Sequence, residues 1–243
     1  MTAPLRNAEA ILHCAGCAGR NHGVCGSLSD RTLARVAQRA RTISVAANDR
    51  LCEEDVSCHH IALVQSGMLR MQSHSLAGRR KITGLVVPGD SIGQIIRGTR
   101  DTAIEAVIDT KLCLFEAANF AQLIEQEPEL RRALCHQAEN WTEKARRLSL
   151  LLGAYGPASR LRALLLLAPS IMPWKALPDG GGVLTMLLPR QDIADLIATT
   201  QETVSRSLHQ FQKDGLIDIL NARQFRLNDL EALSEGLEEI LHQ

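Results

Sequence analysis

The spacing of apolar residues changes along the chain. Between residues 43 and 116, short and partly alternating apolar runs are separated by turns such as Ser66-Gly67 and Pro88-Gly89-Asp90. Many short strands joined by glycine turns are typical of an antiparallel jelly roll. Residues 28–40, just before this region, show the spacing of a short amphipathic helix. We therefore expect a β-rich domain in the first half of the chain.

The next region, residues 128–152, has the spacing of one long helix, and Pro128 is suited to its first position. Its apolar residues recur in alternating steps of four and three, as in a coiled-coil seam: Leu134, Ala138, Trp141, Ala145, Leu148 and Leu152. The pattern indicates either pairing with a second copy of the helix or packing on the β-rich domain. The position of the helix between two domains favours a homodimer.

The last third of the chain predicts a pair of short helices, residues 190–197 and 201–213, joined by the turn Ala198-Thr199-Thr200. Thr200 is a suitable N-cap for the second helix, and Gly215 follows its end. The buried stripe of that helix is Val204, Leu208 and Phe211. We also expect a helix at 158–168, a loop at 169–182, strands at 183–188, 218–220 and 224–227, and a final helix at 230–241.

The polar face of the second helix suggests its chemistry. Glu202, Ser205 and Arg206 stand at positions i, i+3 and i+4, near the helix N-terminus, beside Thr200 and Gln201. A recognition helix enters the major groove of DNA with this end, where arginine can pair with guanine and glutamate with cytosine. An ordinary helical hairpin with a solvated polar face is the alternative interpretation.

Charge limits how the chain could bind DNA. Its 243 residues include 27 Lys and Arg and 27 Asp and Glu, so the formal net charge is zero. Residues 151–228 contain eight basic and six acidic side chains, so affinity must come from placed contacts more than from bulk charge. We find neither an apolar run of about 20 residues nor a signal pattern, and expect a cytoplasmic protein without membrane contact.

Seven cysteines in that compartment favour metal or redox chemistry over disulfides. Cys14, Cys17 and Cys25 form a C-x2-C-x7-C pattern with interspersed glycines, which let a backbone wrap closely around an inorganic centre. Iron–sulfur clusters prefer four cysteines. A tetrahedral zinc site could use His13 or His22 as its fourth ligand, and a disordered leader is a further alternative.

Two motifs resemble a known family. Glu202-Thr203-Val204-Ser205-Arg206, followed by Phe211-Gln212-Lys213-Asp214-Gly215, is similar to the helix-turn-helix of the CRP–FNR family of bacterial transcription regulators, in its FNR-type version. The resemblance implies a homodimer that reads an inverted repeat of TTGAT half-sites in double-stranded DNA and contacts RNA polymerase. It also implies a β-roll sensor domain, a dimerisation helix and a wing.

The same resemblance implies an oxygen-labile [4Fe–4S] cluster on Cys14, Cys17, Cys25 and a distant cysteine, which corresponds to Cys113. The second gap has seven residues here, whereas the best-known FNR pattern has five. Cys52, Cys58 and Cys135 are interpreted as core or incidental residues, and Cys58-His59-His60 is a less favoured metal motif.

Cyclic nucleotide binding is not expected. Cyclic-nucleotide-binding members of the family carry a Gly-Glu turn followed by an arginine, whereas this chain has Gly89-Asp90, and Arg97 and Arg100 lie outside the matching context. A carboxylate without a matched cation would repel a phosphate. Haem is an alternative because the domain contains His59, His60 and His74.

Together these patterns predict an α+β fold with an N-terminal antiparallel β-roll (jelly-roll) sensor domain, a long dimerisation helix and a C-terminal winged helix-turn-helix. The expected parts are a cysteine-rich segment (1–27), the sensor (28–118), the dimerisation region (119–152) and the DNA-binding domain (153–243). The expected function is oxygen- or redox-responsive transcription regulation. Alternatives are a zinc, thiol or haem signal on the same fold, or an iron–sulfur electron carrier or enzyme, although we find no constellation of catalytic residues.

Overall fold

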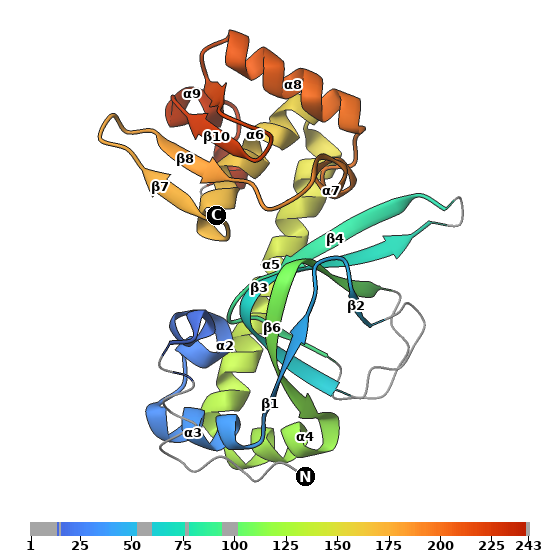
Figure 1. Ribbon diagram of the computed structural model, residues 1–243, viewed down its shortest axis with the longest axis vertical. Helices are drawn as coiled ribbons and strands as arrows, with labels where there is room; N and C mark the ends of the chain where they lie inside the picture. The colour runs from blue at the N-terminus through green and yellow to red at the C-terminus, as the bar shows by residue number, and fades with distance from the viewer. Residues whose placement is uncertain (1–13, 15, 53–59, 76–77, 94–101, 242–243) are drawn as a thin grey trace. The chain divides into compact units, whose positions relative to one another are not determined.

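The computed structural model describes residues 14, 16–52, 60–75, 78–93 and 102–241. The chain forms two compact units (Figure 1). The N-terminal unit comprises residues 1–78 and 83–143, and the C-terminal unit comprises residues 79–82 and 144–243. None of the helices in the described ranges has both the length and the hydropathy needed to cross a bilayer.

The N-terminal unit is built on an antiparallel sheet, as predicted. Its main path is β1 (Arg41–Val45), β6 (Ala103–Glu116), β3 (His60–His74) and β4 (Arg80–Val86). β2 (Arg50–Cys52) pairs with β6, and β5 (Ser91–Ile92) pairs with β3. Buried side chains from these strands, among them Val64, Leu69 and Leu112, fill the core between them.

The predicted turn at Ser66-Gly67 is wrong, because β3 runs through it as one strand. The pairing with β6 shifts register on either side of Ser66, which marks a bulge in the sheet. Gly67 has a φ of +97°, and a Cβ there would lie 2.3 Å from Thr110 Oγ1. The glycine therefore allows a close approach between two strands of the sheet.

Helices close one side of this unit. η1 (Ala18–Asn21), α2 (Gly23–Gly26) and α3 (Asp30–Gln38) precede the sheet, and α4 (Ala117–Gln126) and α5 (Pro128–Ala154) follow it. α3 confirms the helix predicted within 28–40, and Ser29 caps it by accepting from Thr32 N. α3 lies beside α4 and the start of α5 (Figure 1). Leu33, Val36, Phe120 and Leu130 belong to the core that these helices share.

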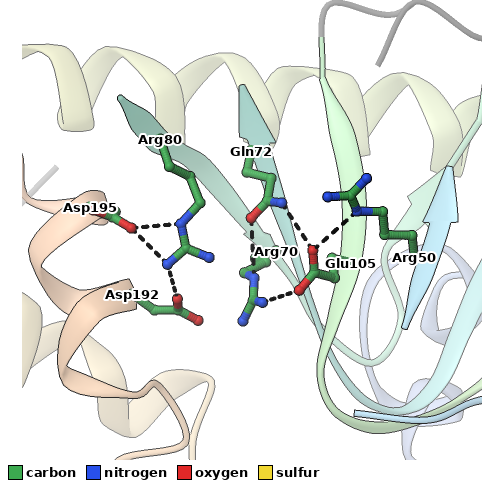
Figure 2. A network of polar contacts seen from close by, with 7 residues as sticks. All are labelled: Arg50, Arg70, Gln72, Arg80, Glu105, Asp192 and Asp195. Atoms are coloured by element: carbon green, nitrogen blue, oxygen red, sulfur yellow. Dashed lines mark hydrogen bonds and ion pairs between the residues drawn. The ribbon is translucent and has the colours of Figure 1, made fainter. Parts of the chain in front are cut away.

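Figure 2 shows two groups of polar contacts, each around a buried carboxylate, Glu105 or Asp192. In the N-terminal unit, Glu105 accepts from Arg70 and from Gln72 Nε2, and Arg50 lies 3.7 Å away. In the C-terminal unit, which includes the first residues of β4, Arg80 forms ion pairs with Asp192 at 2.5 Å and Asp195 at 2.7 Å. Asp192 is buried, so an ionised carboxylate there requires such a partner.

The predicted seam of α5 contains residues in different environments. Leu134 packs partly on the core formed by α3, α4 and the sheet, and Trp141 packs on the sheet core next to Gly84. Ala138 and Ala145 are exposed, whereas Leu148 and Leu152 are half-buried. Self-pairing through these six positions remains a prediction, and the packing of Trp141 shows that the helix also serves the sensor fold.

The C-terminal unit combines helices with a four-stranded antiparallel sheet. The sheet order is β7 (Trp174–Ala176), β8 (Gly182–Thr185), β10 (Gln224–Leu227) and β9 (Ile217–Ile219). The helical elements are α6 (Pro157–Leu167), η2 (Ala168–Ser170), α7 (Arg190–Leu196), α8 (Gln201–Lys213), α9 (Leu230–Ser234) and α10 (Glu238–Leu241).

Two predictions for this unit are wrong. Residues 169–182 are not only a loop, because they contain η2 and β7. The predicted final helix is broken into α9 and α10 around Gly236, which has a φ of +72°. This left-handed conformation ends a helix and is readily adopted by glycine.

Candidate cysteine centre and DNA-binding helix

Four cysteines from distant parts of the sequence meet in the N-terminal unit. Cys17 precedes η1, Cys25 lies in α2, and Cys113 lies near the C-terminal end of β6, where it is paired with Leu63 of β3. Together with Cys14, these residues line one cavity, which is completed by Arg20, Leu33, Leu63, Val64 and Gln65. The structure thus brings together all four predicted cluster cysteines, each with a free thiol.

The cavity between these residues is small. Its volume is about 20 Å³, room for about one water-sized sphere. Within the described parts of the chain, no three cysteine, histidine or acidic side chains are placed to hold a metal ion. The four thiols match the donor set of a [4Fe–4S] cluster, which is held by four cysteines. A cluster of four irons and four sulfides is larger than this cavity, so the thiols would have to move apart to bind one.

Burial and mutual proximity raise the pKa of three of these thiols, those of Cys25, Cys113 and Cys14. The pKa of Cys25 is raised to about 12, chiefly by desolvation and then by the negative charges that Cys113, Cys17 and Cys14 would carry. Desolvation also raises the pKa of Cys113 to about 11, against a lowering hydrogen bond from Gln65. The pKa of Cys14 is raised by desolvation and by Cys17. Bound metal favours the thiolate, so it would reverse this preference.

Gln65 and Arg20 supply polar groups around the thiols. Gln65 Nε2 donates to Cys113 Sγ at 2.8 Å, and the backbone oxygen of Gln65 lies 3.8 Å from Cys17 Sγ. Arg20 donates to the backbone oxygen of Cys25 at 3.3 Å and to Asp30 at 2.8 Å. Sequence reasoning missed both residues, because neither belongs to a metal-ligand pattern. The position of Arg20 inside the cysteine segment was the one available signal.

The cysteine segment is held on the sheet by its backbone. Val24 N donates to Gly89 O at 2.9 Å, and Gly89 N donates to Val64 O at 3.0 Å. A Cβ at Gly89 would lie 2.5 Å from His22 O, and one at Gly23 would lie 2.2 Å from Gly89 O. Gly23 and Gly89 also have positive φ values of 54° and 93°. The two glycines therefore permit a contact that side chains would prevent.

The same contact bears on cyclic nucleotides. Asp90, the residue that departs from the family's Gly-Glu turn, is buried, and its Oδ2 accepts from Val87 N at 3.1 Å. Its carboxylate therefore stabilises the turn that carries Gly89. Arg97 and Arg100 lie outside the described residues. The expectation that no cyclic nucleotide binds here remains a prediction.

Among the described residues, neither Cys52 and Cys135 nor His22, His60 and His74 line this cavity. Cys135 is exposed on α5. Cys52 packs against the sheet core. His22 is exposed, and His60 and His74 occupy opposite ends of β3, so these two histidines do not converge on one haem site. His13, Cys58 and His59 also lie outside the described residues.

The helix pair of the C-terminal unit has the predicted form. α8 begins and ends at the predicted residues, and Thr200 caps it by accepting from Thr203 N at 3.2 Å. Val204, Leu208 and Phe211 are buried. On the other face, Gln201, Glu202 and Arg206 are exposed and Ser205 is half-buried. Arg206 donates to Thr203 Oγ1 at 3.3 Å, which leaves its guanidinium at the surface near the helix N-terminus.

The fold and this helix define a class of protein. An antiparallel sensor sheet, a long helix and a helix pair flanked by the β9–β10 wing form a two-part DNA-binding regulator. Residues 42–127 match the cyclic nucleotide-binding domain and residues 159–235 match the Crp-like helix-turn-helix domain. The chain belongs to the CRP–FNR family of transcription regulators.

The similarity to known proteins extends over most of the chain. It is 29% identical to the nitrogen fixation regulation protein FixK of Bradyrhizobium diazoefficiens, across 86% of this chain and 87% of that protein. It is 27% identical to the transcriptional activator protein FnrL of Cereibacter sphaeroides, across 95% of this chain and 94% of that protein. The solved structure of FixK2 from Bradyrhizobium japonicum superposes with a TM-score of 0.72 at 26% identity, covering 81% of this chain and 96% of that one.

Proposed function

We propose that this regulator senses oxygen or redox state through a [4Fe–4S] cluster on Cys14, Cys17, Cys25 and Cys113. The observation that carries the proposal is their convergence: three cysteines near the N-terminus and one on β6 line a single cavity. The cluster would supply an oxygen-sensitive group that orders the loop when bound. The protein acts in the cytoplasm as a regulator of transcription and not as an enzyme.

Side-chain hydrogen bonds at Ser29 and Ser91 link the sensor to the long helix, in addition to the apolar packing described above. Ser29, the N-cap of α3, donates from its backbone N and its Oγ to Glu129 Oε2 at 2.9 and 2.7 Å. Ser91, two residues after Gly89, donates to Gln137 Oε1 at 2.6 Å and accepts from Gln137 Nε2 at 3.1 Å. Both partners are on α5. Movement of the cysteine segment would therefore act on α5 at two positions about two turns apart.

We infer that an intact cluster favours the paired form of α5, in which two copies of α8 face the two halves of an inverted TTGAT repeat. The two-fold symmetry of such a site matches that of a homodimer. Loss of the cluster shifts the population towards a form that releases DNA. RNA polymerase is the further partner that the family implies.

A thiol switch is the second candidate, and the small size of the cavity favours it. Two of the clustered thiols could lose two protons and two electrons to a peroxide or a disulfide oxidant and form a disulfide. This reaction requires no metal. It would fix the segment 14–25 to itself or to β6.

DNA binding by protein purified without oxygen tests the proposal. Affinity for a duplex with an inverted TTGAT repeat is measured by fluorescence anisotropy before and after air is admitted, alongside the protein's mass in solution. The cluster account predicts tight binding by a dimer and weaker binding after air, not restored by dithiothreitol alone. Full restoration by dithiothreitol supports the thiol switch. Binding that is indifferent to air and to oxidants contradicts both.

A further inference from the structure

Arg160, on the first turn of α6, joins two parts of the C-terminal unit. Its Nε donates to Tyr155 O at 2.7 Å and its Nη2 donates to Leu152 O at 2.7 Å. Its Nη1 donates to Ile197 O at 3.2 Å and Ala198 O at 3.3 Å. One half-buried guanidinium thus contacts the end of α5 and the turn that leads into α8.

These four carbonyls lie where helices end. The last carbonyls of a helix lack partners within the helix, and the negative end of its dipole favours a cation. Leu152 is in the last turn of α5, and Ile197 is the C-cap of α7. Ala198 has a φ of 52°, and Thr199 N donates back to Ala194 O at 2.9 Å, so α7 ends in a left-handed turn without glycine.

We propose that Arg160 is a positioning residue for sequence reading by α8. The planar guanidinium has donors in fixed directions, so it sets the distance between the end of α5 and the 197–198 turn. The 197–198 turn leads into Thr200, the N-cap of α8, and therefore fixes the position at which α8 begins. Arg160 therefore holds the reading face of α8 in register with the end of α5 without contacting DNA. The inference rests on α8 as the reading helix and is independent of the cluster.

Arg162 provides a matched control. It lies on the same helix, is also half-buried, and donates to Ala232 O at 3.3 Å and Ser159 Oγ at 3.5 Å. Arg162→Met thus removes the same charge but loosens a contact to α9. Each variant is assayed with a duplex that the unaltered protein selects from a random pool, and with a scrambled duplex, at temperatures where circular dichroism shows the folded protein.

The ratio of the two affinities is the decisive readout, because a general loss of stability or charge lowers both affinities alike. Arg160→Met is expected to reduce this ratio about tenfold or more, the size that corresponds to losing charged hydrogen bonds to carbonyls. Arg162→Met is expected to leave it unchanged. The slope of affinity against salt should be the same in both variants, and Arg160→Lys, which keeps the charge without the fork, should be intermediate.

Three results would overturn the inference. An unchanged ratio in folded Arg160→Met means that the contact does not position α8. A salt slope reduced by about one in Arg160→Met alone means that Arg160 binds phosphate directly. If the unaltered protein selects no sequence at all, reading by α8 itself fails, and the inference fails with it.

Discussion

The cysteine centre and the reading helix are built in opposite ways. α8 is a continuous stretch of thirteen residues that contains its own buried stripe and polar face, and its cap, Thr200, directly precedes it. The cysteine centre joins residues 14–25 to a strand position at 113, and it depends on backbone contacts at Gly89. A local element tolerates changes elsewhere in the chain. An assembled centre fails when any one of its distant parts moves, which suits a sensor.

The largest expected effect comes from removing the distant member of the centre. In Cys113→Ser, iron bound after anaerobic reconstitution should fall from about four per chain to almost none, because a cluster of this type needs four cysteine ligands. Cys135→Ser removes an exposed thiol outside the cavity and should keep full iron content. Full occupancy in Cys113→Ser would place the fourth ligand elsewhere.

A smaller but still large effect should follow from filling the glycine contact. Gly89→Ala combines a left-handed φ with a Cβ 2.5 Å from His22 O, so unfolding in urea should show a loss of about 3 kcal/mol, with reduced iron binding. Gly78→Ala has a similar φ of 72° but open space around its Cβ, and should cost only about 1 kcal/mol. Equal losses in the two variants would show that the contact with the cysteine segment is unimportant.

A substitution on the polar face of α8 should change only DNA binding. Arg206→Ala is expected to cost about 1–3 kcal/mol on a selected duplex and to relax the choice at one base pair. Lys213→Ala removes the same charge from the last turn of α8 and should leave base preference intact. A uniform loss on all duplexes by Arg206→Ala would make Arg206 a phosphate contact.

The smallest effect concerns pH. Hydrogen bonds from Ser29 hold the pKa of Glu129 below its ordinary value of 4.5, so this carboxylate stabilises the fold above that pH and loses the effect as the pH falls through its lowered pKa. Glu129→Gln should therefore reduce the fall in the free energy of unfolding between about pH 6 and pH 3. Glu125→Gln, which removes an exposed carboxylate on α4, serves as the control and should leave that fall unchanged.

Local sequence patterns predicted the local elements well. The limits of α8 and its buried residues follow from a Thr cap and a stripe at helical spacing, and the structure confirms them. The antiparallel sheet and the long helix from Pro128 are confirmed as well. The errors at Gly67 and Gly236 have a common cause: a glycine pattern does not distinguish a turn, a bulge and a helix break, which tertiary packing decides.

The centre was less accessible to sequence reasoning. Spacing identified Cys14, Cys17 and Cys25 as a group, but Cys113 was selected only by resemblance to a family. Gln65, Gly89 and Arg160 carry no pattern that predicts their roles, since each acts through contacts with segments far away in the sequence. Their roles depend on the folded arrangement of the backbone.

Iron and acid-labile sulfide content, with an absorption spectrum, is the direct test of whether the four cysteines bind a cluster. The measurement is made on protein purified without oxygen and repeated after air is admitted. If the four cysteines hold a [4Fe–4S] cluster, the protein should contain about four irons and four sulfides per chain and show a broad visible band that changes in air. A colourless protein that remains free of iron after anaerobic reconstitution would contradict cluster binding.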